Sequence, residues 1–189
     1  MIIQVDSRVL LSCKKGNKQS FAELFKSYEK YLFNLCMGYA GNEYDALDLV
    51  QETFIKVYRN FDKYDIDRPF HPWIRKVAVN TCLNFKRERK SNIISLNAVT
   101  QNNIAIEEII ASDEDLESEM EKIDLERIIK NQMKVLSDKQ RMVITLRYFE
   151  DLSYAEIARA MDQPIGTVKT DLYRARNVLK ENLSYVLEE

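Results

Sequence analysis

The stretch "SYAEIARAMDQPIGTVKTDLYRAR", residues 153–176, decides the fold of the second half of the chain. It begins with Ser153 and places Glu156 three residues later, which is the capping-box pattern that starts an α-helix. After the turn "DQPIG", apolar residues recur at helical spacing: Val168, Leu172, Ala175 and Leu179. A short helix, a tight turn and a second helix together form a helix-turn-helix.

The outward face of the second helix carries the residues expected to meet DNA. In a helix-turn-helix the second helix enters the major groove, with its N-terminal part against the base edges. We predict that seven residues face outward and bind DNA: Thr167, Lys169, Thr170, Tyr173, Arg174, Arg176 and Asn177. Their Arg and Lys side chains can pair with guanine edges or with phosphates, and the sequence does not distinguish between these two partners. Asp171 lies among them and would repel phosphate, so this unit should bind DNA poorly by itself.

A second capping box precedes this motif. Ser137 with Gln140 begins the segment "SDKQRMVITLRYF", and a further helix is predicted around residues 125–136. We therefore expect a small helical C-terminal domain over residues 125–189.

Residues 1–91 predict another helical domain. Apolar residues recur at steps of three and four along one helix, and we expect them to form its buried stripe: Leu47, Val50, Phe54, Val57 and Phe61. The opposite side carries Asp48, Gln51, Glu52, Ile55 and Arg59. After a loop containing Asp and Pro, Pro72 fits the first turn of the next helix. The expected apolar face of that helix comprises Ile74, Val77, Ala78, Thr81, Cys82 and Phe85.

That same helix also carries a line of amides and cations, which ends in the run "KRERK" at residues 86–90. Amides read exposed base edges, cations follow a nucleic-acid backbone, and aromatic rings stack on bases. This surface therefore suits single-stranded DNA, and its basic run is expected to reach duplex phosphates. We predict that six of its residues contact DNA: Phe70, Lys76, Asn80, Asn84, Arg87 and Arg89. The neighbouring Trp73 is either a core residue or a stacking platform, and the core is the more common place for a tryptophan.

An acidic segment separates the two domains. Residues 91–124 carry a charge of −8, whereas residues 1–90 carry +5 and residues 125–189 carry +1, for a total of −2. We expect residues 92–124 to form a linker, because like charges at short range keep a chain extended. A solvated acidic helix starting near Ser112 is the alternative for the second half of this segment.

Composition narrows the class of protein. A hydrophobic share of 46% with only 4 Gly and 3 Pro favours a mostly helical protein, and no run approaches the roughly 20 apolar residues of a membrane span. We therefore expect no membrane insertion and a cytoplasmic location. Three scattered cysteines and one histidine argue against a disulfide framework, a metal site and His-dependent catalysis. No glycine-rich phosphate loop occurs either, so we expect neither a cofactor nor an enzyme.

Three segments together resemble a known family: "DLVQETFIKVYRNFDKY", "PWIRKVAVNTCLNF" and "LSYAEIARAMDQPIGTVKTDLYRAR". They are similar to the bacterial sigma-70 family of RNA polymerase sigma factors, specifically the extracytoplasmic-function (ECF) group that keeps only regions 2 and 4. Residues 21–91 resemble region 2, and residues 125–183 resemble region 4. The resemblance implies an all-α fold with two small domains and a non-enzymatic role: binding core RNA polymerase, directing it to promoters and promoting their opening.

The resemblance also implies a role for each surface. The segment "DLVQE" matches the motif that docks on the clamp helices of the polymerase β′ subunit, and the implied core-binding residues are Asp48, Gln51, Glu52 and Ile55. Residues 65–71 and the helix after them match the part that captures a flipped base of the single-stranded −10 element. The helix from Thr167 matches the reader of the duplex −35 element. The implied partners are core polymerase, through its β′ and β subunits, promoter DNA and a dedicated anti-sigma protein.

Two other classes compete with this interpretation. One is a free-standing regulator that binds duplex DNA as a dimer, and the other is an enzyme. The regulator would protect DNA without polymerase, whereas a sigma factor would need the core enzyme.

Overall fold

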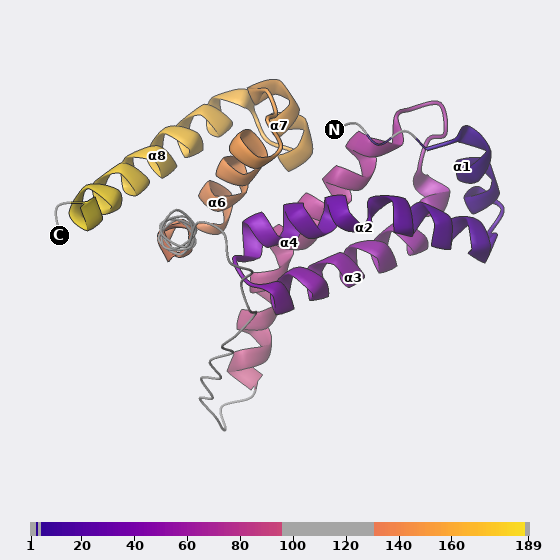
Figure 1. The fold of residues 1–189 in the computed structure, drawn as a ribbon, viewed down its shortest axis with the longest axis horizontal. Coiled ribbons are helices and arrows are strands. Elements are labelled where there is room, and N and C mark those ends of the chain that lie inside the picture. Colours follow the sequence, from indigo (N-terminus) through magenta and orange to yellow (C-terminus); the bar gives the residue numbers. More distant parts are fainter. Residues whose placement is uncertain (1–2, 4, 96–130, 188–189) are drawn as a thin grey trace, which may run out of the picture.

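The computed structural model describes residues 3, 5–95 and 131–187, and it describes side chains as far as Phe85 in the first part and Leu183 in the second. The predicted all-α class is confirmed, since the described residues contain helices and turns but no strand (Figure 1). The N-terminal part contains α1 (Ser7–Lys14), α2 (Lys18–Ala40), α3 (Glu43–Arg59), the short 3-10 helix η1 (Phe61–Lys63) and α4 (Phe70–Ser95). The predicted linker lies outside the described residues from residue 96 onward.

Polar caps start the N-terminal helices. The side chains of Asp6, Asn17 and Asn42 each accept a hydrogen bond from a backbone N–H in the first turn of α1, α2 and α3. At the other end of α2, Gly41 adopts φ +73°, a left-handed conformation that glycine tolerates and that terminates the helix. These caps fix where α1, α2 and α3 begin and where α2 ends.

The buried face of α3 differs from the predicted stripe at one position. Val50, Val57 and Phe61 are buried, but Leu47 is 44% exposed, so its predicted place in the core is wrong. The helix packs against α2 and α4 at once, and its inward side includes Leu49 and other small or apolar residues beside the stripe. Leu47 lies on the edge that neither neighbour covers.

The C-terminal domain follows the predicted order. Residues 131–135 are helical and are followed by α6 (Asp138–Ile144), the π-helix η2 (Thr145–Phe149), α7 (Tyr154–Met161) and α8 (Ile165–Leu187). Both predicted capping boxes are confirmed, because Ser137 with Gln140 and Ser153 with Glu156 make both reciprocal hydrogen bonds. The recognition helix begins at Ile165, slightly before the expected position.

A buried arginine holds the start of this domain. Arg141 is 4% exposed and donates from Nε to the Met133 carbonyl at 2.8 Å, and from Nη2 to the Leu136 carbonyl at 3.0 Å and the Lys134 carbonyl at 3.3 Å. These carbonyls lie at and just after the end of the helical residues 131–135, where a helix leaves its acceptors unpaired. Arg141, in α6, therefore caps the C-terminal end of the preceding helical residues 131–135.

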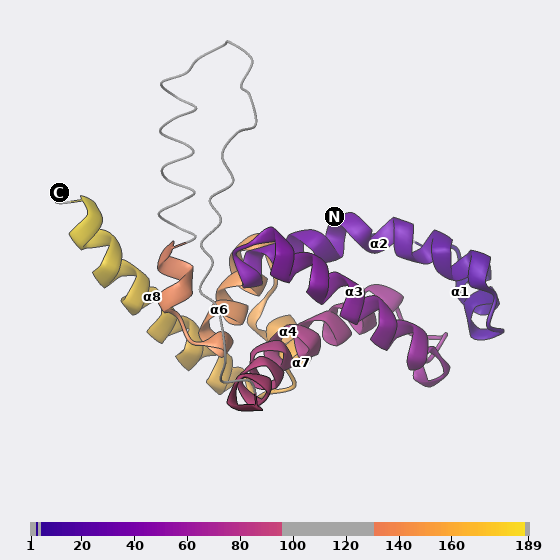
Figure 2. The same ribbon diagram turned by 90° about the horizontal axis from the view of Figure 1, so that it is seen from below.

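The two domains also contact each other. In the C-terminal domain, α7 packs against α4 and η2 packs against α2, while α8 extends away from the N-terminal helices (Figures 1 and 2). Residues far apart in the sequence are therefore neighbours across this contact.

Candidate DNA-binding and polymerase-binding surfaces

The recognition helix α8 presents its polar residues to solvent. Val168, Leu172 and Ala175 are buried against α6 and α7, as their spacing predicts. The seven residues predicted to face outward are all exposed: Thr167, Lys169, Thr170, Tyr173, Arg174, Arg176 and Asn177. Helical periodicity thus places one row in the core and leaves a cationic row on the surface.

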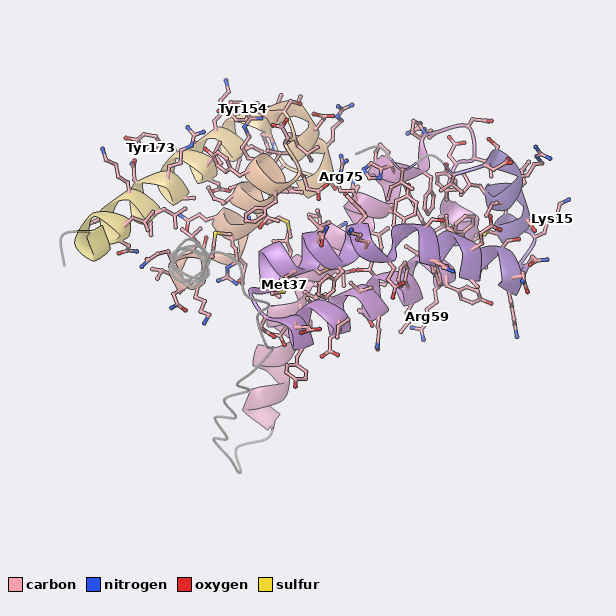
Figure 3. The ribbon with its side chains drawn as sticks, viewed as in Figure 1. Lys15, Met37, Arg59, Arg75, Tyr154 and Tyr173 are labelled. Carbon is pink, nitrogen blue, oxygen red and sulfur yellow. The ribbon has the colours of Figure 1, made fainter. Side chains whose placement is uncertain are left out.

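One member of this row is held by a neighbour. Arg176 donates from Nε to the hydroxyl of Tyr148 at 2.7 Å, and its guanidinium carbon lies 5.6 Å from the centre of the Tyr148 ring. Both side chains are exposed, so the pair is part of the same surface. Figure 3 shows the labelled Tyr173 projecting outward from α8.

A groove lies between α3, η1 and the middle of α4. It has a volume of about 350 Å³. Asn80 and Asn84 lie along it with their side chains exposed. Its remaining lining residues are Lys56, Asn60, Lys63, Trp73, Val77 and Thr81. Amides, ammonium groups and one aromatic ring therefore meet in a single depression.

Three of these lining residues escaped the sequence analysis. Lys56, Asn60 and Lys63 come from the preceding helical segment, and only the packing of α3 on α4 brings them beside Asn80. Their spacing of three and four was a usable signal, because it places the three residues on one face of a helix.

Two aromatic residues near the groove have different positions. Phe70 is 5% exposed and its ring packs edge-on against Tyr28 and Tyr64, with centroids 5.3 Å and 5.2 Å away. Its predicted place among the DNA-contacting residues is therefore corrected: the aromatic cluster holds it in the core. Trp73 is half-buried: its ring packs 5.5 Å from that of Phe70, and it also lines the groove.

The cations of the predicted line have different environments. Lys76 is half-buried, and its Nζ lies 3.5 Å from Oδ1 of Asp162 in the C-terminal domain. Arg87 and Arg89 lie on α4, but their side chains fall outside the described part of the chain. The structure therefore brings Asn80 and Asn84 together in the groove, whereas the Lys76 side chain is directed to Asp162.

The exposed face of α3 forms a third surface. Asp48, Gln51 and Ile55 are exposed, and Ile55 is 43% exposed. Glu52 is half-buried, with Oε1 lying 3.3 Å from Nζ of Lys56 one turn later. This salt bridge directs Glu52 toward the groove side of α3.

Apolar residues join this third surface and were not predicted as surface residues from the sequence. Tyr44 is 72% exposed, Leu47 44% and Tyr58 48%. Together with Gln51 and Ile55 they recur at steps of three and four, which places them on one face. We call this face, Tyr44, Leu47, Gln51, Ile55 and Tyr58, the α3 stripe. Contiguous large apolar side chains exposed to water are typical of an interaction surface.

Other kinds of site are absent from the part of the chain that the structure describes. No group of three or more His, Cys, Asp or Glu side chains could hold a metal ion there, and no described helix is long and apolar enough to cross a membrane. Cys13, Cys36 and Cys82 are free and buried. Burial raises the pKa of the Cys13 thiol to about 11, which keeps it protonated and unreactive near neutral pH.

Comparison with known proteins identifies the family of the chain. Residues 24–92 match the family described as sigma-70 region 2, and residues 126–179 match sigma-70 region 4. An ECF RNA polymerase sigma factor of Bacillus subtilis, SigW, is 33% identical over 172 residues, covering 90% of this chain and 92% of its own. The chain belongs to the ECF group of sigma-70 factors. As a sigma factor it is a non-enzymatic transcription initiation factor, whose partners are core RNA polymerase and promoter DNA.

Further relatives agree with this assignment. The ECF sigma-E factor of Escherichia coli K12 is 33% identical over 183 residues, covering 93% of each chain. Among solved structures, the sigma factor RpoE of Bartonella quintana, in complex with the anti-sigma factor NepR, is 25% identical with a TM-score of 0.62, covering 90% of this sigma factor and 98% of that chain. CnrH in complex with the cytosolic domain of CnrY shares the fold, at 20% identity and a TM-score of 0.62 over 96% of this chain and 99% of its own. The free-standing regulator and the enzyme are set aside.

Proposed function

We propose that this sigma factor divides promoter recognition among three surfaces: the face of α3 for core polymerase, the groove on α4 for the single-stranded −10 element, and the outward face of α8 for the duplex −35 element. In this division residues 1–91 act as region 2, residues 92–124 as a linker and residues 125–189 as region 4. The observation that carries the proposal is the groove, where amides, cations and a tryptophan converge. The cytoplasm is the place of action, because its polymerase works there.

The face of α3 suits a large protein partner. We assign Asp48, Gln51, Glu52 and Ile55 to core polymerase, and the α3 stripe adds apolar area around them. Interfaces combine such an apolar centre with a polar rim, and aromatic residues are enriched in them. The acidic residues Asp48 and Glu52 give the rim a charge that steers a basic partner surface.

The groove suits an unstacked base and its phosphates. Asn80 and Asn84 offer both donors and acceptors to a base edge, and Lys56 and Lys63 provide charges for the backbone. Trp73 supplies a ring on which a base can stack. We also assign Lys76, Arg87 and Arg89, on the same helix, to DNA phosphates. Phe70 supports the groove from the core.

The outward face of α8 suits the major groove of a duplex. Its Arg and Lys residues reach base edges and phosphates, and Thr167 in the first turn of α8 can bind a phosphate through its hydroxyl. Asp171 is half-buried next to this row and limits the affinity for DNA. Weak contacts from α8 and from the groove become strong when polymerase holds both, through effective concentration. A dedicated anti-sigma protein is a further proposed partner.

Transcription by purified core polymerase over a library of genomic promoters tests the proposal. Ile55→Glu should weaken core binding at least tenfold, because it places a charge in the apolar centre of the α3 stripe. Asn80→Ala should leave core binding unchanged and reduce strand opening, measured by permanganate reactivity of the −10 region. Glu29→Gln on the exposed side of α2 is the matched control. Equal loss of both activities in every variant would refute the division among surfaces.

A further inference from the structure

The loop that joins η1 to α4 leads into the groove. It includes residues 65–69, of which Ile66 is half-buried and the other four are exposed. The first turn of α4 follows at once and carries Trp73, which lines the groove. A loop that is free to move loses conformational entropy when it orders on a ligand. The bonds that hold this loop therefore affect how readily it can take part in binding.

Hydrogen bonds within the loop give it a defined turn. Oδ1 of Asp65 accepts from the backbone N–H of Asp67 at 3.1 Å, and the Asp65 carbonyl accepts from the backbone N–H of Arg68 at 3.1 Å. Nε of Arg68 also lies 3.1 Å from Oδ2 of Asp65. Because water competes for these exposed groups, they shape the turn but do not fix it to the rest of the domain.

Tyr64 fixes the loop from the core. It is 1% exposed, and its ring centre lies 5.2 Å from that of Phe70 and 5.1 Å from that of Trp73. Its hydroxyl donates a hydrogen bond to the carbonyl of Arg68, near the far end of the loop. Burial, and secondarily the charge of Asp65, raise the pKa of this hydroxyl, so it stays protonated and remains a donor. Tyr64 thus joins the two ends of the loop and supports the ring that lines the groove.

Lys14 fixes the same residue from another helix. It is the last residue of α1, and its Nζ donates to the carbonyl oxygen of Tyr64, 50 positions along the chain, at 2.8 Å. Hydrogen bonds from a charged donor are stronger than those between neutral groups. The buried Leu10 and Cys13 hold α1 against the domain, and α1 lies at the same end of the domain as the loop (Figure 1). Lys14 therefore ties the start of the loop to a packed helix.

The neighbouring Lys15 offers a direct comparison. Figure 3 shows Lys15 projecting outward at the end of the N-terminal helices. Both lysines are exposed and carry the same charge, but the hydrogen bond to the loop comes from Lys14. The match to sigma-70 region 2 begins at residue 24, so it includes neither of them. A comparison of the two positions separates the effect of the hydrogen bond from the effect of charge.

We infer that Lys14 and Tyr64 are positioning residues, which hold residues 65–69 and Trp73 ready to receive an unstacked base of the −10 element. They act through the loop and the tryptophan ring, without touching the base. The inference rests on the proposed function of the groove. Its physical basis is pre-organisation, because a loop that is ordered during folding loses less entropy when the strand binds.

Binding of a single-stranded oligonucleotide to the sigma factor with core polymerase tests the inference. The probe carries the non-template −10 sequence of a promoter recovered from the genomic library. Lys14→Met keeps the aliphatic stem and removes the donor, and Tyr64→Phe keeps the ring and removes the hydroxyl. Each variant should bind the probe about fivefold more weakly, with its affinity for core polymerase unchanged. Lys15→Met is the matched control and should lose less than about twofold.

Abasic probes distinguish positioning from direct contact. Each position of the −10 sequence is made abasic in turn, which removes the base and keeps the phosphate. At the position of the captured base, the wild-type and Lys14→Met chains should bind the abasic probe equally, because the loop then has no base to receive. Lys14→Arg keeps a charged donor and should restore at least half of the wild-type affinity for the complete probe. Lys14 is exposed, so Lys14→Met carries the test even if Tyr64→Phe destabilises the aromatic cluster.

Three results would overturn the inference. Unchanged probe binding by Lys14→Met would show that the loop is positioned without this lysine. An equal loss in Lys15→Met would reduce the effect to general charge. A loss in Lys14→Met that persists with every abasic probe would indicate direct contact with phosphate. The proposed function fails separately: if no abasic position weakens binding by the wild-type chain, the groove captures no base.

Discussion

The single histidine should make the N-terminal domain sensitive to acid. His71 is 8% exposed, its ring centre lies 4.6 Å from that of Tyr31 and 5.8 Å from that of Tyr28, and its Nδ1 has no hydrogen-bond partner. Burial, and secondarily the charge of Arg75, lower the pKa of His71 from 6.5 to about 4. The folded protein therefore keeps this imidazole neutral at a pH where the unfolded chain takes up a proton.

The sign and size of the effect follow from this difference. Because the unfolded state binds the extra proton between the two pKa values, the free energy of unfolding falls as the pH drops from about 6.5 to about 4. One proton changes stability by at most about 1.4 kcal/mol per pH unit, so the whole loss is about 3 kcal/mol. His71→Phe keeps an aromatic ring in the cluster and removes the titrating group, so this part of the loss should disappear.

Urea unfolding followed by Trp73 fluorescence provides the measurement, because the only tryptophan lies in the same aromatic cluster. The wild-type and His71→Phe chains are compared at several pH values from about 7 to about 4.5. Carboxylates that titrate in this range affect both chains. The difference in the free energy of unfolding between the two chains therefore reports on His71 alone. We expect that difference to grow by about 2–3 kcal/mol on acidification.

Two results would refute this reasoning. One is a difference in the free energy of unfolding between the two chains that stays constant with pH. The other is an ordinary histidine pKa near 6.5 in the nuclear magnetic resonance titration of the folded protein. The single imidazole signal makes that titration unambiguous.

Three further predictions concern stability. Arg141→Met should destabilise the C-terminal domain by about 3 kcal/mol, because buried carbonyls lose their donor, and an unchanged urea midpoint would contradict this. Ser153→Ala should cost about 1 kcal/mol by removing one capping box, measured by thermal unfolding, with no effect expected from Ser27→Ala on the exposed side of α2. Leu49→Ala should cost about 3 kcal/mol, because this leucine is fully buried, and a loss below about 1 kcal/mol would argue against its place in the core.

Local signals predicted the fold well. Capping boxes at Ser137 and Ser153 involve residues three positions apart, and the inward row of α8 follows from helical periodicity alone. The same periodicity gave a wrong prediction for Leu47. The helices that pack around α3 decide which of its edges is buried, and local sequence does not encode that packing.

The candidate surfaces were predictable only in part. Asn80 and Asn84 could be found because they share one helix face, whereas Lys56 and Lys63 join them only through the packing of α3 on α4. Phe70 was misplaced because an aromatic residue in a loop pattern gives no sign of the rings that surround it. The contact of Gly38 with Thr145 joins residues 107 positions apart, and no local pattern encodes such a pair.

The pairing of Arg176 with Tyr148 has a consequence for the entropy of the DNA recognition proposed for α8. A free arginine side chain carries about 2 kcal/mol of rotamer entropy, which is lost when it is immobilised on a base or a phosphate. The 2.7 Å hydrogen bond and the aromatic ring beneath the guanidinium restrict those rotamers before any DNA arrives. Part of the Arg176 rotamer entropy is therefore already lost during folding. A recognition helix with few cations then loses less side-chain entropy when it binds DNA.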